Sequence, residues 1–205
     1  MINTVIFDVG MVLAEFRWKA YLADFGWDEE INEKVAKATV LSTTWNQFDK
    51  GVLEWKDLYA EFCSHDRTVV EQIREFFEDL GNIVRMYEDS VEWVKSVKAN
   101  GCKVYILSNY PEYLFDKSQK ELTFLEYVDG AVFSFEEKTV KPEPEIYQRL
   151  LEKYQINPRE AVFLDDVEVN LEEAKRQGIL TIHVSDRAKA QEELQNMLKK
   201  VEKKS

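Results

Sequence analysis

The chain has 205 residues, of which 45% are hydrophobic and 32% charged, so it can bury a core without disulfide or metal support. Its 39 acidic residues outnumber the 27 basic ones and give a formal net charge of −12, which argues against nucleic acid or an anionic membrane as a partner. Two cysteines, Cys63 and Cys102, are too few for a disulfide framework, and no apolar run reaches the roughly 18 residues of a membrane span. We therefore expect a soluble, cytoplasmic protein and make no prediction of its oligomeric state.

Five short apolar runs predict the strands of a parallel sheet, in chain order at residues 4–9, 103–108, 130–134, 161–164 and 179–184. Each run is nearly continuous in apolar residues, which is typical of strands covered on both faces. Apolar residues at helical spacing separate the later runs, at residues 91–97, 146–154 and 168–177. This alternation of strand and helix predicts a doubly wound α/β fold with right-handed crossovers.

Residues 15–86 interrupt this alternation, because no strand run is visible there. Helical patterns occur instead around residues 29–40, 54–63 and 68–80, and four of the five tryptophans fall in this segment. We predict an all-helical module over residues 15–86, inserted into a core made of residues 1–14 and 87–205. In the tail, a helix that packs on this core is predicted by the helical spacing of Leu194, Met197, Leu198 and Val201.

Polar residues follow the predicted strands, at the sheet edge where open α/β folds bind ligands. They are Asp8, Ser108, Asn109, Lys141, Asp165 and Asp166. Each close pair among the three carboxylates costs about 4 kcal/mol at an effective dielectric near 20. A divalent cation and Lys141 would offset this repulsion, and an all-oxygen ligand set suits Mg²⁺. The site would then accept a phosphate dianion, held by Ser108 and by backbone amides at the start of a helix.

Four segments occur in an order that resembles the haloacid dehalogenase superfamily of phosphohydrolases: FDVGMVL, VYILSN, VKPEPEIY and VFLDDVEVN. The inserted module lies where that superfamily places its helical C1 cap, on a Rossmann-like core. The combination of DxG in the first motif with DDxxxN in the fourth resembles the branch that contains sugar-1-phosphate phosphatases of the α-glucose-1-phosphatase type. The resemblance implies an Mg²⁺-dependent phosphatase whose substrate is a small phosphorylated metabolite such as a sugar phosphate.

The resemblance also implies a role for each motif residue. Asp8 would be the nucleophile that forms an aspartyl-phosphate, and Lys141 would neutralise charge on Asp8 and on the phosphate. The transferring phosphoryl group would be bound by Ser108, with Asn109 beside it. The metal ligands would be Asp8, Asp166 with the assistance of Asp165, and the backbone carbonyl of Gly10.

One position departs from the family pattern, since Gly10 stands where most phosphatases of this superfamily carry a second Asp as general acid and base. The loss of such a group typically costs about 10²- to 10⁴-fold in rate. Glu15 is one candidate replacement. Alternatively, the leaving group needs little protonation, as with an anomeric hydroxyl. A third reading is a catalytically weak protein that binds a phosphate ligand or a protein partner.

Residues of the inserted module are expected to set substrate choice. The candidates that face the site are Arg17, Trp18, Trp45, Phe48, Asp49 and Lys50. The aromatic residues have an alternative role as the packed interior of the module, and Arg17 and Lys50 as solvated surface. Another reaction of the same superfamily, such as metal-independent carbon–halogen hydrolysis, also remains open.

Overall fold

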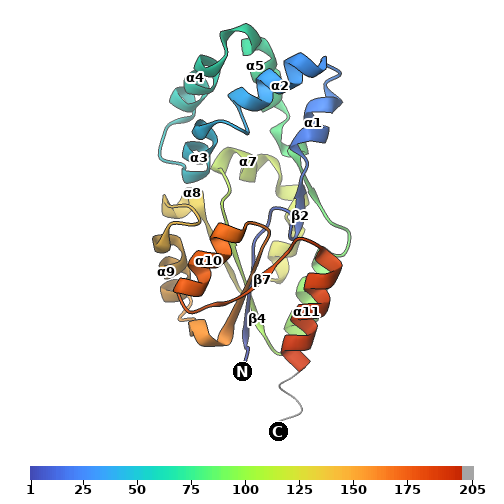
Figure 1. Ribbon diagram of the computed structural model, residues 1–205, viewed down its shortest axis with the longest axis vertical. Helices are drawn as coiled ribbons and strands as arrows, with labels where there is room; N and C mark the ends of the chain where they lie inside the picture. The colour runs from blue at the N-terminus through green and yellow to red at the C-terminus, as the bar shows by residue number, and fades with distance from the viewer. Residues whose placement is uncertain (200–205) are drawn as a thin grey trace.

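A parallel five-stranded sheet stands at the centre of the computed structural model, which describes residues 1–199 (Figure 1). The strands are β1 (Thr4–Phe7), β4 (Lys103–Ser108), β5 (Gly130–Phe133), β6 (Ala161–Asp165) and β7 (Leu180–His183), in the spatial order β5-β4-β1-β6-β7. All four neighbouring pairs are parallel, and β1 is central, with Thr4 aligned with both Lys103 and Ala161. The sequence prediction of five parallel strands is confirmed, with ends that differ by up to two residues.

Helices cover both faces of the sheet, as expected for a doubly wound fold. Val5 and Phe7 point to the face covered by α6 (Ser90–Ala99) and α11 (Arg187–Lys199), whose buried side chains share one hydrophobic cluster with them. Ile6 points to the other face, which packs on α9 (Pro144–Lys153) and α10 (Glu168–Arg176). The predicted tail helix is therefore present. Leu194 and Leu198 are buried, Met197 is partly buried, and Val201 lies outside the described residues.

The segment between β2 (Ala14–Phe16) and β3 (Val84–Met86), which we call the cap, lies above the sheet in Figure 1. It contains α1 (Trp18–Asp24), α2 (Glu29–Ala38), α3 (Thr43–Lys50), α4 (Trp55–His65) and α5 (Val70–Glu78), with 3₁₀ turns at Arg67–Val69 and Leu80–Ile83. Its interior is aromatic, since Phe48, Phe62, Phe76 and Phe77 are all buried and in mutual contact. Large rings supply the apolar area that a small helical unit needs.

The expectation that residues 15–86 contain no strand is wrong. β2 and β3 pair antiparallel, with Glu15 opposite Arg85, and form the two connections between the cap and the sheet. Each strand is only three residues long and pairs with a partner about 70 positions away, so neither leaves a local periodic signal. Shorter elements after the cap also escaped prediction: α7 (Glu112–Lys117), α8 (Ser134–Glu137) and the 3₁₀ turns Gln119–Glu121, Thr123–Tyr127 and Pro158–Glu160.

The C-terminal end of α3 is docked on α8 of the sheet-bearing part. Gly51 ends α3 with φ 61°, and a Cβ at this position would lie 3.2 Å from Phe135 Cα. Lys138 Nζ donates to the Gly51 carbonyl at 2.6 Å, and Ser134 Oγ donates to the Asp49 carbonyl at 2.6 Å. Trp55 of the cap also stacks on Tyr113 of α7, with ring centroids 4.5 Å apart. The cap is thus held in contact with the rest of the molecule beside the carboxyl ends of the strands.

Within residues 1–199, no helix has both the length and the apolarity that crossing a membrane requires. Cys102 is buried as a free thiol.

Candidate active site

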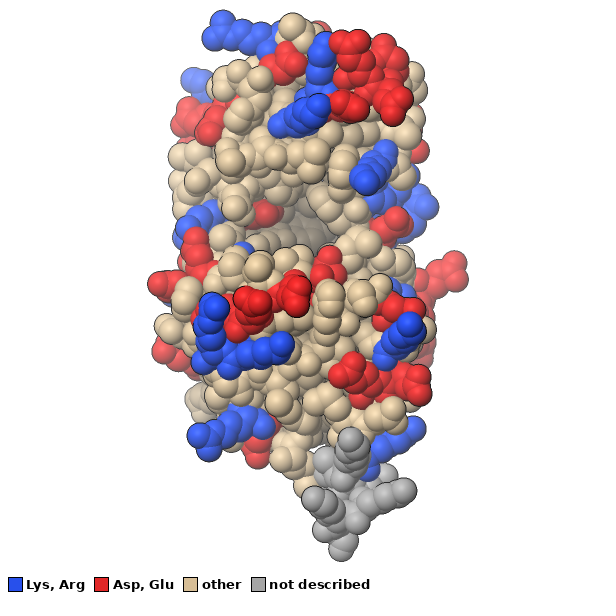
Figure 2. Space-filling view, viewed as in Figure 1, with Lys and Arg blue, Asp and Glu red and all other residues tan. Residues whose placement is uncertain are grey.

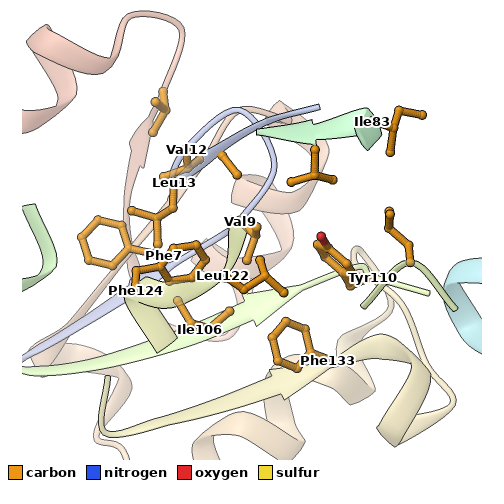
Figure 3. Close-up of a cluster of buried hydrophobic side chains, with 14 of the residues drawn as sticks. Phe7, Val9, Val12, Leu13, Ile83, Ile106, Tyr110, Leu122, Phe124 and Phe133 are labelled. Carbon is orange, nitrogen blue, oxygen red and sulfur yellow. The ribbon is translucent and has the colours of Figure 1, made fainter. Parts of the chain in front are cut away.

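The loop after β1 holds Asp8 at the carboxyl end of the central strand. The amides of Val12, Leu13 and Ala14 all donate to the Val9 carbonyl, and the Val9 amide donates to Asp8 Oδ1 at 2.7 Å. Val9, Val12 and Leu13 are buried in the hydrophobic cluster that Figure 3 shows beneath this loop. This packing anchors the backbone, so the Asp8 carboxylate has a fixed place.

Lys141 lies between two carboxylates at this edge. Its Nζ is 2.9 Å from Asp8 Oδ1 and 2.7 Å from Asp165 Oδ2, and its side chain is 1% exposed. Asn109 fixes the Lys141 backbone, because Asn109 Oδ1 accepts from the Lys141 amide at 2.7 Å and Nδ2 donates to its carbonyl at 3.0 Å. Asn170 Nδ2 lies 3.1 Å from both Asp165 oxygens. Asp165 therefore acts mainly as the fixed partner that orients Lys141.

The protonation of these groups follows from burial and mutual charge. Burial raises the pKa of Asp8 to about 6, with a further rise from Asp165, while Lys141 opposes both effects. Burial alone would lower the pKa of Lys141, but the charges of Asp165 and Asp8 outweigh it and raise this pKa above its usual value. Lys141 is therefore a permanent cation at physiological pH, aimed at the Asp8 carboxylate.

Asp8, Asp165 and Asp166 together form a candidate metal site. Each offers one carboxylate oxygen, and these oxygens lie within 4.8 Å of one another. Asp165 is already engaged by Lys141 and Asn170, which leaves Asp8 and Asp166 as the better-placed ligands. Burial and the Asp165 charge raise the pKa of Asp166, which is the effect that a bound cation would reverse. An all-oxygen donor set of this kind fits Mg²⁺.

A cleft of about 240 Å³ opens between this edge and the cap, and Figure 2 shows the hollow at their junction. Its polar lining residues are Asp8, Glu15, Asp49, Ser108, Asn109, Lys141, Asp166 and Asn170. The rest of the lining is mostly apolar: Val9, Gly10, Met11, Ala14, Phe16, Trp45, Val84, Tyr110, Pro111, Leu114 and Val167. One end of the cleft is thus charged, and the wall above it is apolar.

Comparison with known proteins places the chain in a family. A family model described as a hydrolase, haloacid dehalogenase-like hydrolase, matches residues 2–178. The chain belongs to this family. The resemblance of its four motifs is thereby confirmed, and the chain is a hydrolase of the haloacid dehalogenase type.

Relatives of this hydrolase include phosphatases. A sesquiterpene phosphatase of Aspergillus oryzae is 26% identical over 90% of both chains. A phosphorylated carbohydrates phosphatase of Thermotoga maritima is 29% identical over 64% of this chain and 58% of its own. Among solved structures, a haloacid dehalogenase family enzyme of Bacteroides thetaiotaomicron, in complex with magnesium and inorganic phosphate, aligns with a TM-score of 0.68. It covers 89% of this chain and 94% of its own at 22% identity, which shows a shared fold.

The structure brings most of the predicted site residues of the hydrolase together. The cleft is lined by Asp8, Gly10, Ser108, Asn109, Lys141 and Asp166. Asp165 does not line it but accepts a hydrogen bond from Lys141 Nζ at 2.7 Å. Glu15 and Trp45, predicted from the inserted module, also line it. Ser108 is fully buried at the end of β4, next to Asn109.

Four residues of the inserted module do not line the cleft, contrary to expectation. Arg17 binds the Asn82 carbonyl at 2.9 Å and pairs with Asp24 at 2.8 Å. Trp18 and Phe48 pack in the apolar interior, which is the alternative that the sequence left open. Lys50 pairs with Glu143 at 2.6 Å and links the cap to the loop after Lys141. Arg17 and Trp18 were candidates because they closely follow the first motif, and Phe48 and Lys50 because they precede Gly51. Neither position in the sequence determines the direction of the side chain.

Two groups of site residues were missed or given too little weight. Asn170 ends the fourth motif, and its spacing of five residues from Asp165 was the available signal for the contact between them. The apolar wall from Phe16, Val84 and Tyr110 had no signal, because tertiary packing alone brings these residues together.

Asp49 is the most unusual titratable group in the cleft. It is 9% exposed, and burial raises its pKa to about 8 even though Lys141 opposes the effect; Asp8 adds to the rise. A carboxyl of this kind is protonated at neutral pH.

Proposed function

We propose that this hydrolase is an Mg²⁺-dependent phosphatase that transfers a phosphoryl group from its substrate to Asp8 and then hydrolyses the aspartyl-phosphate. The observation that carries the proposal is the buried pairing of Lys141 with Asp8 at 2.9 Å, inside a cluster of three carboxylates at the strand ends. The Aspergillus oryzae relative, named a phosphatase and aligned over 90% of both chains, supports it. In this proposal the inserted module, residues 15–86, closes over a core made of residues 1–14 and 87–205.

Each residue has a defined task in this reaction. Asp8 attacks phosphorus, and the charge that develops on the transferring group is offset by Lys141, which cannot move because Asp165 and Asn109 hold it. Ser108 binds a phosphoryl oxygen beside Asp8. Mg²⁺ held by Asp8, Asp166 and the Gly10 carbonyl would add positive charge at the same place.

We further propose that the substrate is the monophosphate of a small, largely apolar alcohol. Above the charged end, the cleft is lined by Met11, Phe16, Trp45, Val84 and Leu114, which offer few partners for the hydroxyls of a sugar. The Aspergillus oryzae relative, named a sesquiterpene phosphatase, supports this choice over the carbohydrate phosphatase of Thermotoga maritima, which aligns with a smaller part of the chain.

Phosphate release from a panel of esters tests both parts of the proposal. Wild type and Asp8→Asn are compared with Mg²⁺ and with EDTA, on branched alkyl or prenyl monophosphates and on sugar 1-phosphates. We expect turnover by wild type with Mg²⁺ alone, at least 10-fold higher kcat/KM on the apolar esters (about 1.4 kcal/mol), and no turnover by Asp8→Asn. Faster hydrolysis of sugar phosphates would overturn the substrate class. Phosphate binding without turnover would indicate a binding protein. Release of halide from a haloacid without a metal would indicate a dehalogenase.

A further inference from the structure

The carboxylate of Asp49 has no partner in the part of the chain that the structure describes. Only its backbone carbonyl is engaged, by Ser134 Oγ, and the charged groups that act on the carboxyl are Lys141 and Asp8 across the cleft. Asp49 is nevertheless buried, with only 9% of its surface exposed, and it lines the cleft from the cap side. Within residues 1–199, the only fully buried side-chain nitrogen or oxygen without a partner is Asn32 Oδ1, so the Asp49 oxygens keep some accessible surface. Because Asp49 lines the cleft, a ligand bound there can reach its carboxyl group.

The backbone of Asp49 is fixed in this position. It is the penultimate residue of α3, where the contacts of Ser134 and Lys138 with the Asp49 and Gly51 carbonyls hold the helix on α8. The adjacent Lys50 is tied to Glu143, two residues after Lys141. The cap segment that carries Asp49 is therefore coupled to the loop that carries Lys141, and a phosphate ester bound at Asp8 would place its leaving group on the side of Asp49.

Gly10, by contrast, has no side chain where the family usually has its acid. A Cβ built at Gly10 has no atom within 4 Å, so there is open space at this position. Neither crowding nor backbone conformation requires glycine here. The cleft thus lacks an acid at the usual place, and it has a buried, unpartnered carboxyl on the opposite wall.

We propose that Asp49 is the general acid and base of this enzyme, supplied by the cap in place of an acid at Gly10. This inference rests on the proposed phosphatase function. As Asp8 attacks phosphorus, the bond to the leaving oxygen breaks and that oxygen takes the proton of Asp49, which releases the alcohol. Water then attacks the aspartyl-phosphate and gives its proton to Asp49, the P–O bond to Asp8 breaks, and phosphate leaves. Both carboxyl groups return to their starting states.

The charge environment supports this role. The burial that raises the pKa of Asp49 keeps the proton in place at neutral pH, which is the form that an acid needs before the first step. Glu15 is the competing candidate. It lines the same cleft from β2 but is only half-buried, and in the register of the strands it lies opposite Arg85.

Leaving-group dependence tests the assignment, because a general acid matters most when the departing oxygen is basic. The substrates are p-nitrophenyl phosphate, which needs little protonation, and an alkyl monophosphate, which needs much. We expect Asp49→Asn to lose about 10²- to 10³-fold on the alkyl ester and less than about 10-fold on the nitrophenyl ester. Asp49→Glu keeps a carboxyl and should recover part of the loss. Asp57→Asn, on the exposed face of α4, is the matched control and should leave both rates unchanged.

Addition of Asp at Gly10 provides a rescue. Because space is open there, Gly10→Asp in the Asp49→Asn background should restore alkyl ester hydrolysis by at least 10-fold. An equal loss on both esters in Asp49→Asn would overturn the assignment, and so would a selective loss on the alkyl ester in Glu15→Gln with Asp49→Asn unaffected. If wild type hydrolyses neither ester with Mg²⁺, the proposed function itself fails. Circular dichroism of each variant excludes misfolding as the cause of a loss.

Discussion

The two walls of the cleft differ in how their charged groups are held. On the sheet side, Asp8, Lys141 and Asp165 form a closed ion network, and Asn109 and Asn170 brace it with four hydrogen bonds. On the cap side, the wall is mostly aromatic and aliphatic, and its two carboxyls, Asp49 of α3 and Glu15 of β2, have no hydrogen-bond or ion-pair partner among the described residues. The sheet side thus provides a rigid, pre-ordered charge arrangement, while the cap side provides an apolar surface and carboxyls that no ion network holds. A charged wall held by hydrogen bonds, which we call the fixed half, and a mostly apolar wall, which we call the apolar half, meet in one site.

The largest effect should come from removing the cation of the fixed half. Lys141→Met leaves Asp8 and Asp165 facing each other in a buried place, so we expect unfolding free energy to fall by about 3–5 kcal/mol at pH 8. Phosphate release should fall by about 10²- to 10³-fold as well. Urea unfolding at pH 8 measures the first effect. Lys153→Met, an exposed lysine 3.8 Å from Glu137, is the control and should change stability by less than about 1 kcal/mol.

A smaller effect should come from the cap carboxyl, with a sign that depends on pH. The folded-state pKa of Asp49, about 8, lies above its unfolded value of 3.8. Between these values the folded state binds more protons than the unfolded state, so metal-free wild type loses stability as pH rises from about 4 to about 8. Asp49→Asn removes this loss. The stability of the variant relative to wild type should therefore rise by on the order of 2 kcal/mol from pH 5 to pH 8.

Urea unfolding in EDTA at the two pH values measures this difference. Asp8 has a raised pKa of the same sign, but it is present in both proteins and cancels in the comparison to first order. Asp57→Asn should show no such pH-dependent gain. A stability difference between Asp49→Asn and wild type that is equal at pH 5 and pH 8 would contradict the raised pKa.

The same contrast between the two walls explains what the sequence could predict. The strands and the residues at their ends form a local, ordered pattern, so the sequence alone predicts that Asp8, Lys141 and Asp166 meet at one edge of the sheet. In the cap, helical periodicity places Trp45 and Phe48 on a helix but does not say which neighbour each will contact. Trp45 reaches the cleft while Phe48, three residues later, is buried among Phe62 and Phe77.

The short strands β2 and β3 and the direction of Arg17 were unpredictable for a related reason. Their partners lie far away in the sequence: Glu15 is opposite Arg85, and Arg17 binds the Asn82 carbonyl. A three-residue strand carries too little pattern to be separated from a loop, and only the folded chain selects its partner.

Substitution of Trp45 should weaken substrate binding by the apolar half without changing the chemical step in the fixed half. This side chain lines the cleft and contacts Phe16 at 5.9 Å between ring centroids. Trp45→Ala should raise KM for an apolar monophosphate by about 10-fold, or about 1.4 kcal/mol, because the substrate loses an aromatic contact. The kcat for p-nitrophenyl phosphate should stay within about 3-fold, since Asp8 and Lys141 are untouched. Steady-state kinetics on both esters decides, and a fall in kcat on both with unchanged KM would refute the separation of the two walls.

The smallest effect should come from the ion pair that joins the two halves. Lys50 and Glu143 approach to 2.6 Å, but both side chains are partly exposed, at 28% and 39%, so solvent screens the pair. Lys50→Met should therefore cost less than about 1 kcal/mol of stability. Glu143 also accepts from Thr139, so its place beside Lys141 is kept when Lys50 is lost. If the pair serves mainly to hold Asp49 over the cleft, alkyl phosphate hydrolysis should fall more than nitrophenyl phosphate hydrolysis, by about 3-fold. Equal rates for Lys50→Met and wild type on both esters would show that the contacts of Ser134 and Lys138 suffice to position the end of α3.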